Sequence, residues 1–241
     1  MSQTTAVTQE EIIRALSTAL ISRTSMQLHN IFRGVPVNFP ALVTSVDRDT
    51  VVLKVHRLQS VVISVEKRTF IKSATFPDFI RAFPKTVNFN TQEVVLTQFS
   101  STGKAFTERA HIRVQFEEPI NVGILNEDGL TLGTLTDISK SCPGVFVFGA
   151  YIPEKILVNL EGNTRVCLDF SLPGIDQIIH LVGTITNLSL RKGAVMTRIG
   201  IQTSPAQSME TALMKYIDRR QVEILDELQR IYHRACNLKQ A

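Results

Sequence analysis

The sequence predicts a mainly β fold made of two small antiparallel β-barrels, with a helix near each end of the chain. Short strand-like segments recur at intervals of about 8–12 residues, which is typical of barrels and sandwiches. No long helical segments separate them, so a parallel sheet is not favoured. With 241 residues, the chain is long enough for two domains of ordinary size.

Composition and sequence patterns exclude several classes of protein. Hydrophobic residues make up 44% and charged residues 20% of the chain, which is enough to bury two cores. No apolar run approaches the length of a membrane span, and the first residues lack the pattern of a signal peptide. The three cysteines are far apart and form no metal-binding or disulfide pattern. We therefore expect a cytoplasmic protein without membrane insertion, and a net charge of +4 is too small to indicate nucleic-acid binding.

The first expected domain, residues 1–103, begins with a helix. Thr8 and Glu11 have the spacing of a capping box, in which each side chain hydrogen-bonds the backbone of the other residue. Apolar residues then follow at helical spacing down to about Ser25; they are Ile12, Ile13, Leu16, Ala19 and Leu20.

From about Val35 the hydrophobic pattern changes to a period of two. Residues 41–46 and 50–55 flank a turn at Asp47, Arg48 and Asp49, which predicts a β-hairpin. Further strands are expected at residues 61–65, 69–72, 86–89 and 93–96. The polar, glycine-bearing residues 100–104 are the best candidate for an interdomain linker.

The second expected domain, residues 104–207, contains six strand-like segments and no long helix, so an antiparallel barrel is expected. Turn chemistry between the segments comes from Gly129, Gly144, the Pro173–Gly174 pair and the Lys192–Gly193 pair. The segments are residues 112–124, 130–138, 145–148, 165–170, 178–187 and 195–202.

The tail, residues 208–241, predicts one long helix with a narrow apolar seam. The seam steps alternately by three and four residues, as in a coiled coil, and charged residues such as Arg220 are expected outside it. Two interpretations stay open: the seam packs on the chain's own barrel, or it pairs with a second copy to form a homo-oligomer. The seam residues are Met214, Ile217, Gln221, Ile224, Leu228, Ile231, Ala235 and Leu238.

No catalytic constellation is apparent. The five histidines are scattered without the spacing of metal ligands, and nucleophile-elbow, dinucleotide-binding and P-loop motifs are absent. We expect no enzymatic activity, no catalytic residue, no metal and no cofactor.

One group of residues does indicate ligand binding. Arg109 and Arg113 lie four residues apart before the first strand of the second domain, and guanidinium groups suit phosphate oxygens and the faces of bases. Asp137 and Ser139 follow at the end of a strand, where a carboxylate and a hydroxyl can hydrogen-bond the edge of a guanine. Cys142 and Gly144 come directly afterwards.

This combination of RxxxR with a later DxS and a glycine-bearing turn resembles the PilZ domain. The resemblance covers about residues 105–204 and includes the strand segments 134–139, 183–187 and 198–202. It implies a six-stranded barrel that binds cyclic di-GMP, with Arg109 and Arg113 on the phosphates and guanine, and Asp137 and Ser139 on a guanine edge. A small, split-barrel-like N-terminal domain before it is similar to the flagellar-brake (YcgR-like) architecture, which implies a protein partner such as the flagellar motor and a place at the flagellar basal body.

The chain departs from the family pattern at one position. The DxSxxG motif has glycine where this chain has Cys142, with Gly144 two residues later. Either a longer turn lets Gly144 take the role of that glycine, or the pocket is altered and binding is weakened. The second alternative implies a degenerate PilZ-like module that serves in protein interaction or oligomerisation and binds no nucleotide.

Overall fold

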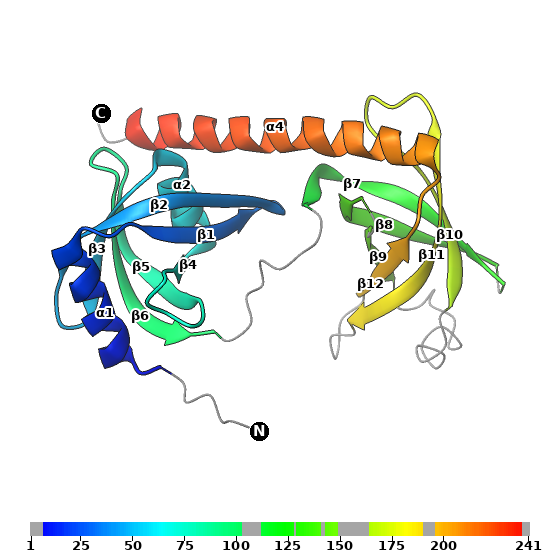
Figure 1. The fold of residues 1–241 in the computed structure, drawn as a ribbon. Coiled ribbons are helices and arrows are strands. Elements are labelled where there is room, and N and C mark those ends of the chain that lie inside the picture. Colours follow the sequence, from blue (N-terminus) through cyan, green and yellow to red (C-terminus); the bar gives the residue numbers. More distant parts are fainter. Residues whose placement is uncertain are drawn as a thin grey trace, which may run out of the picture. The chain divides into compact units, whose positions relative to one another are not determined.

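The computed structural model describes residues 7–102, 112–127, 129–140, 143–148, 164–189 and 196–237. Within these ranges the chain forms two closed antiparallel β-barrels of six strands each, with helices at both ends (Figure 1). This confirms the predicted fold class. By its contacts the chain divides into two compact units, residues 1–109 together with 224–241, and residues 110–223. No helix in the described ranges is long and apolar enough to cross a membrane.

The first barrel has the strand order β1-β2-β3-β6-β5-β4, and β4 closes it by pairing with β1. The predicted hairpin at residues 41–55 is confirmed, because Ala41 pairs with Val55 and Val46 with Val51. Ser100 and Ser101 belong to the end of β6 and pair with β5, so this part of the predicted linker is wrong. The strands are β1 Met26–Phe32, β2 Val35–Val46, β3 Thr50–Val55, β4 Thr69–Lys72, β5 Ile80–Asn88 and β6 Glu93–Ser101.

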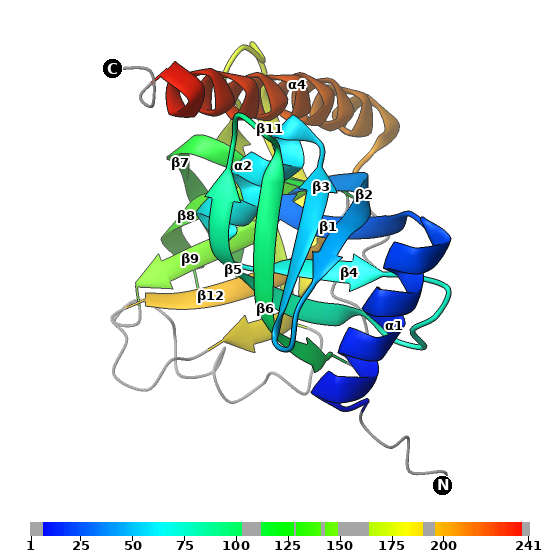
Figure 2. The same cartoon turned by 90° about the vertical axis from the view of Figure 1, so that its left-hand side faces the viewer.

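The predicted N-terminal helix is α1, Gln9–Ser22, and it lies alongside the first barrel (Figure 2). Both bonds of the capping box are present: the Glu11 backbone N–H donates to Thr8 Oγ1 at 3.3 Å, and the Thr8 N–H donates to Glu11 Oε2 at 2.8 Å. The bonds that Glu11 Oε2 accepts from the Thr8 N–H and, at 3.0 Å, from the Thr8 hydroxyl lower the pKa of the Glu11 carboxyl from its ordinary value of 4.5. Ile12 and Leu16 are fully buried, so the helix seals one side of the core.

The sequence predicted a strand at residues 61–65, and this is wrong. These residues are part of helix α2, Arg57–Glu66. The side chain of His56 caps the helix by accepting from the Leu58 N–H at 3.3 Å, and Lys67 ends it in the left-handed conformation. Every residue from Leu58 to Ile63 is buried. Six consecutive buried residues hide the amphipathic period of a helix, and tertiary packing overrides the weak β preference of its valines.

The second barrel has the strand order β10-β11-β12-β9-β8-β7, and β7 closes it by pairing with β10. All six predicted segments are strands. Gly174 lies in a turn and Gly129 is the first residue of β8, and both have the positive φ that glycine adopts readily, whereas Gly144 is the first residue of β9. Lys192 and Gly193 lie outside the described residues. The strands are β7 Arg113–Asn126, β8 Gly129–Ser139, β9 Gly144–Phe148, β10 Arg165–Ser171, β11 Ile178–Ser189 and β12 Met196–Thr203.

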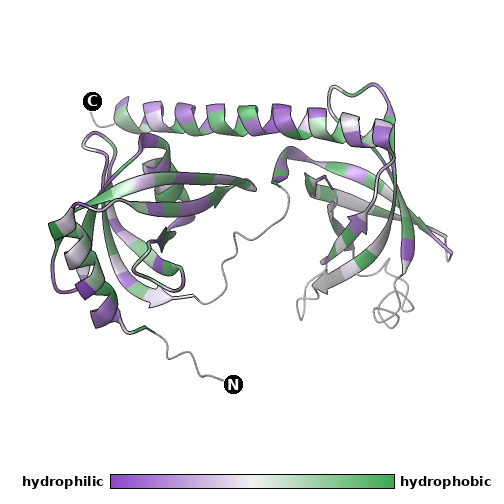
Figure 3. Cartoon of the chain, in the orientation of Figure 1, coloured by the Kyte–Doolittle hydropathy of each residue, from purple (hydrophilic) through white to green (hydrophobic). Residues whose placement is uncertain are grey.

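The C-terminal helix is α4, Gln207–Asn237, along which hydrophilic and hydrophobic residues alternate (Figure 3). Part of its apolar stripe is buried within the chain: among the seam residues, Ile217, Ile224 and Leu228 are buried, whereas Met214, Gln221, Ile231 and Ala235 are partly exposed. Arg220, expected on the charged face, is only 4% exposed, because its guanidinium donates to the Gln115 carbonyl at 3.0 Å and to Glu223 at 2.9 Å. Leu238 lies outside the described residues, and self-association stays a prediction. The buried residues are Leu213, Tyr216, Ile217, Arg220, Ile224 and Leu228.

Candidate ligand-binding site

Four of the six residues that the motif singled out are described, and the structure gathers them at one end of the second barrel. Arg113 begins β7 and lies opposite Ser139, the last residue of β8. Asp137 in β8 lies opposite Gly144 in β9. Arg109 and Cys142 lie outside the described residues. The strand register therefore brings together residues that the sequence separates by about two dozen positions.

Asp137 is the centre of this group. Its Oδ1 accepts from Arg113 Nη1 at 2.9 Å, and its Oδ2 accepts from Arg198 Nη2 at 2.6 Å. The Asp137 side chain is 7% exposed, whereas those of Arg113 and Arg198 are 22% and 45% exposed. A carboxylate this deeply buried needs charged partners, and removing one partner of a buried pair costs about 3–5 kcal/mol. The carboxylate thus fixes both guanidinium groups at the rim of the barrel.

Gly144 lies directly against the Asp137 carboxylate. A Cβ atom added to Gly144 would be 2.5 Å from Asp137 Oδ1 and 2.7 Å from Asp137 Cγ. Such contacts are shorter than any that a side chain tolerates. Gly144 is therefore required for the close approach of β9 to the Asp137 carboxylate, whereas the sequence assigned it to a turn.

Arg198 is a member of the group that the sequence reasoning missed. It lies in β12, opposite Phe146 in β9, and 61 residues separate it from Asp137. Its segment resembled a closing strand of the family, but spacing along the chain gives no sign that β12 pairs with β9. Only the closure of the barrel brings this arginine to the carboxylate.

The cluster contains two guanidinium groups and one carboxylate. Both cations point planar donors at the Asp137 carboxylate, and guanidinium groups match the oxygens of carboxylates and phosphates in geometry. The Thr136 hydroxyl also donates to Asp137 Oδ2 at 3.4 Å, and because a carboxylate has about four acceptor positions, Asp137 can accept from one further donor. Ser139, which is 4% exposed, lies opposite Arg113 in the strand register. Among the described residues, no group of acidic, histidine and cysteine side chains could hold a metal ion.

Fold and site together define a protein of two six-stranded barrels with an arginine–aspartate cluster at the rim of the second one. No family model matches the chain. A curated protein of Aquifex aeolicus (strain VF5), described as an uncharacterized protein, is 31% identical over 137 residues. The match covers 56% of this chain and 61% of that relative, so it spans less than two thirds of the relative's length.

Several solved structures are similar to the chain. MrkH of K. pneumonia in complex with c-di-GMP has a TM-score of 0.44 at 15% identity, covering 92% of this chain and 96% of that one. The inhibitor of motility MotI/DgrA of Bacillus subtilis has a TM-score of 0.42 at 14% identity, with coverages of 83% and 96%. YcgR of Escherichia coli in complex with c-di-GMP has a TM-score of 0.41 at 12% identity, with coverages of 93% and 95%. The similar structures thus include YcgR, whose family the sequence resembles.

Proposed function

We propose that the chain is a receptor for cyclic di-GMP, with the ligand bound at the arginine–aspartate cluster of the second barrel. The observation that carries this proposal is the meeting of Arg113, Asp137, Ser139 and Gly144 at one barrel end. These residues belong to the RxxxR and DxS pattern of the PilZ domain, and the pattern by itself does not place them in contact. MrkH and YcgR, which are named as complexes with c-di-GMP, resemble the chain in fold.

In this proposal each residue has a separate task. Arg113, together with Arg109 before the barrel, binds phosphate oxygens and stacks on guanine, because guanidinium groups combine a planar fork with a flat face. Asp137 orients Arg113 and accepts from a donor on a guanine edge. Ser139 adds a hydroxyl at the same edge, and Gly144 leaves the room in which the Asp137 carboxylate lies.

The contacts proposed for the ligand are hydrogen bonds, ion pairs and stacking, and none of them makes or breaks a bond in the ligand. The proposed role is therefore that of a receptor rather than an enzyme. The output is a changed surface for a protein partner. The flagellar motor is one such partner, since YcgR-like proteins are the family that the sequence resembles, and it would place the protein at the flagellar basal body.

The alternative is a PilZ-like interaction module that binds no nucleotide. Cys142 at the position of the motif glycine favours it. The close approach of Gly144 to Asp137 favours retained binding, because a glycine is still present where backbone must meet the site.

Calorimetric titration with cyclic di-GMP separates the two proposals. The receptor proposal expects binding by the full chain and at least tenfold weaker binding by Arg113→Lys, because a lysine keeps the charge but not the planar fork, and a charge-assisted bidentate contact contributes about 1.5–3 kcal/mol. Arg165→Ala, which removes an exposed arginine of β10 in the same barrel, is the matched control and should bind normally. Absence of binding by the parent chain, with binding gained in Cys142→Gly, would establish the alternative.

A further inference from the structure

The second barrel has a pocket whose lining residues are separate from the arginine–aspartate cluster. Its volume is about 400 Å³, which lies within the range of small-molecule sites, about 300–1,000 Å³. The walls come from residues 116–120 of β7, from Pro173 in the β10–β11 turn, and from one face of α4. All these residues belong to the compact unit of residues 110–223. The pocket is therefore a feature of this unit by itself.

A bulge in β7 forms one wall of the pocket. Residues 116–119 lie opposite the single residue Thr136 of β8, so part of their backbone has no ladder partner on that strand. Bulges bend a strand, re-aim its side chains and are common next to functional sites. In this bulge Phe116 is buried, at 7% exposure, whereas Glu117 and Glu118 are exposed. The bulge thus presents two neighbouring carboxylates beside an aromatic wall.

Contacts within the chain fix the α4 side of the pocket. The centroids of the Tyr216 and Phe116 rings are 5.6 Å apart, and the Arg219 guanidinium lies 5.3 Å from the Tyr216 centroid. The Glu223 carboxylate joins two arginines: its Oε1 lies 3.6 Å from Arg219 Nε, and its Oε2 accepts from Arg220 Nη1 at 2.9 Å. Because a carboxylate of the chain itself holds both guanidinium groups, these arginines do not indicate an anionic ligand.

Arg220 is buried but incompletely hydrogen-bonded. Its side chain lines the pocket, and the residue is only 4% exposed. Nε donates to the Gln115 carbonyl at 3.0 Å and Nη1 donates to Glu223, but the buried Nη2 has no acceptor among the described residues. A buried donor without an acceptor costs free energy, and more so on a charged group. The pocket therefore favours a ligand that brings an acceptor, such as a carbonyl oxygen.

The bulge gives the pocket a negative edge. Burial raises the pKa of the Tyr216 hydroxyl, and the charges of Glu223 and Glu117 raise it further, while two neighbouring arginines lower it. The Glu117 carboxylate therefore lies near the aromatic wall. The lining residues include three glutamates and two arginines, a net charge of −1. Because Glu223 is engaged by both arginines, the two glutamates of the bulge are the groups that attract a cation.

We propose that this pocket docks a short, lysine-bearing segment of a partner protein. The lysine ammonium pairs with Glu117 and Glu118. Its apolar stem lies along Pro119 and Pro173, because long charged side chains cover apolar surface with their methylene groups. A main-chain carbonyl of the segment accepts from Arg220 Nη2, so a peptide supplies the cation and the acceptor together. The site goes beyond the proposed function, because no residue of the arginine–aspartate cluster lines it.

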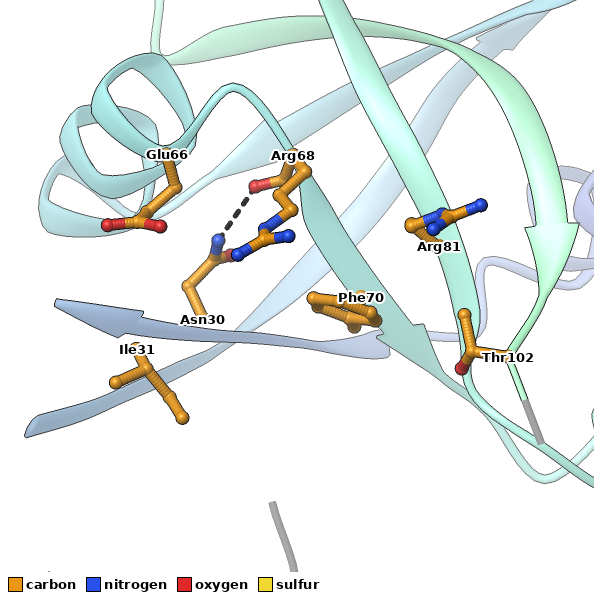
Figure 4. Close-up of a pocket in the computed structure, with 7 residues that line it drawn as sticks. All are labelled: Asn30, Ile31, Glu66, Arg68, Phe70, Arg81 and Thr102. Carbon is orange, nitrogen blue, oxygen red and sulfur yellow. Dashed lines mark hydrogen bonds between the residues drawn. The ribbon is translucent and has the colours of Figure 1, made fainter. Parts of the chain in front are cut away.

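Titration of the nitrogen-15-labelled full chain with an acetylated and amidated trilysine peptide, followed by amide NMR shifts, tests this proposal. We expect saturable shifts at the Glu117 and Glu118 amides. Glu117→Gln and Glu118→Gln should each bind about threefold more weakly, because each variant loses one exposed ion pair. Glu127→Gln, which removes an exposed carboxylate in the β7–β8 turn of the same barrel, is the matched control. Glu66→Gln, in a pocket of the first barrel (Figure 4), is the second control, and both should bind normally.

Spermidine separates a peptide site from a site for any polycation. It carries the same positive charge as the peptide but no carbonyl group, so it should bind more weakly. The titration is done without cyclic di-GMP, so its outcome does not depend on whether the chain binds that nucleotide. Absence of shifts at Glu117 and Glu118, equal weakening in a control variant, or spermidine binding as tight as that of the peptide would overturn the proposal. Far-UV circular dichroism checks that each variant is folded.

Discussion

Gly144→Ala tests the geometry of the arginine–aspartate cluster. The new methyl group would lie 2.5 Å from Asp137 Oδ1, and the carboxylate cannot move aside, because Arg113 and Arg198 hold its two oxygens. Overpacking alone costs about 1–3 kcal/mol, and strain in a buried ion pair adds to it. We therefore expect the free energy of unfolding to fall by about 2–4 kcal/mol. Urea unfolding of the full chain, followed by far-UV circular dichroism, measures the change.

Gly123→Ala is the matched control, because Gly123 also lies in a strand of the second barrel. There the new methyl group would be 3.3 Å from Cδ1 of Leu130, a leucine that is 67% exposed and free to shift. We expect a change within about 1 kcal/mol. A double-mutant cycle gives the decisive comparison: in an Asp137→Ala background, Gly144→Ala should cost much less than in the parent. Equal costs in the two backgrounds would refute the argument.

Three further predictions concern the first barrel, each read from urea unfolding. Thr8→Ala should lower the free energy of unfolding by about 1 kcal/mol, because it removes the N-cap of α1; no change would mean that the cap is dispensable. Asn30→Ala should cost about 2–4 kcal/mol, because the buried Gln59 amide loses its acceptor, whereas the exposed Asn38→Ala should cost little. Burial lowers the pKa of His56 from its ordinary 6.5, so the unfolded chain takes up this proton first and stability should fall as pH drops below about 6.5. His56→Asn, which keeps a capping side chain, should weaken that dependence, and an unchanged pH profile would contradict the assignment.

Local signals predicted much of the fold. The capping box of Thr8 and Glu11, the hairpin around Asp47 and the six strands of the second barrel all depend on residues close together in the sequence. Strand β1 was missed because Asn30, a polar residue, occupies an inward position in the middle of its hydrophobic alternation. The hydrogen bonds that make Asn30 acceptable there come from residues 29 and 39 positions later, which no local pattern shows.

The sequence also predicted part of the candidate site. The family pattern identified Arg113, Asp137, Ser139 and Gly144, and the structure brings them together, while their role in binding stays a prediction. Arg198 was missed because it reaches Asp137 only through barrel closure.

Isothermal titration of the purified full chain with cyclic di-GMP tests the central claim most directly. We predict saturable binding that Arg113→Ala abolishes and Arg165→Ala leaves unchanged, with both variants folded. The absence of heat and of competition at high ligand concentration in the parent chain, or undiminished binding by Arg113→Ala, would contradict it.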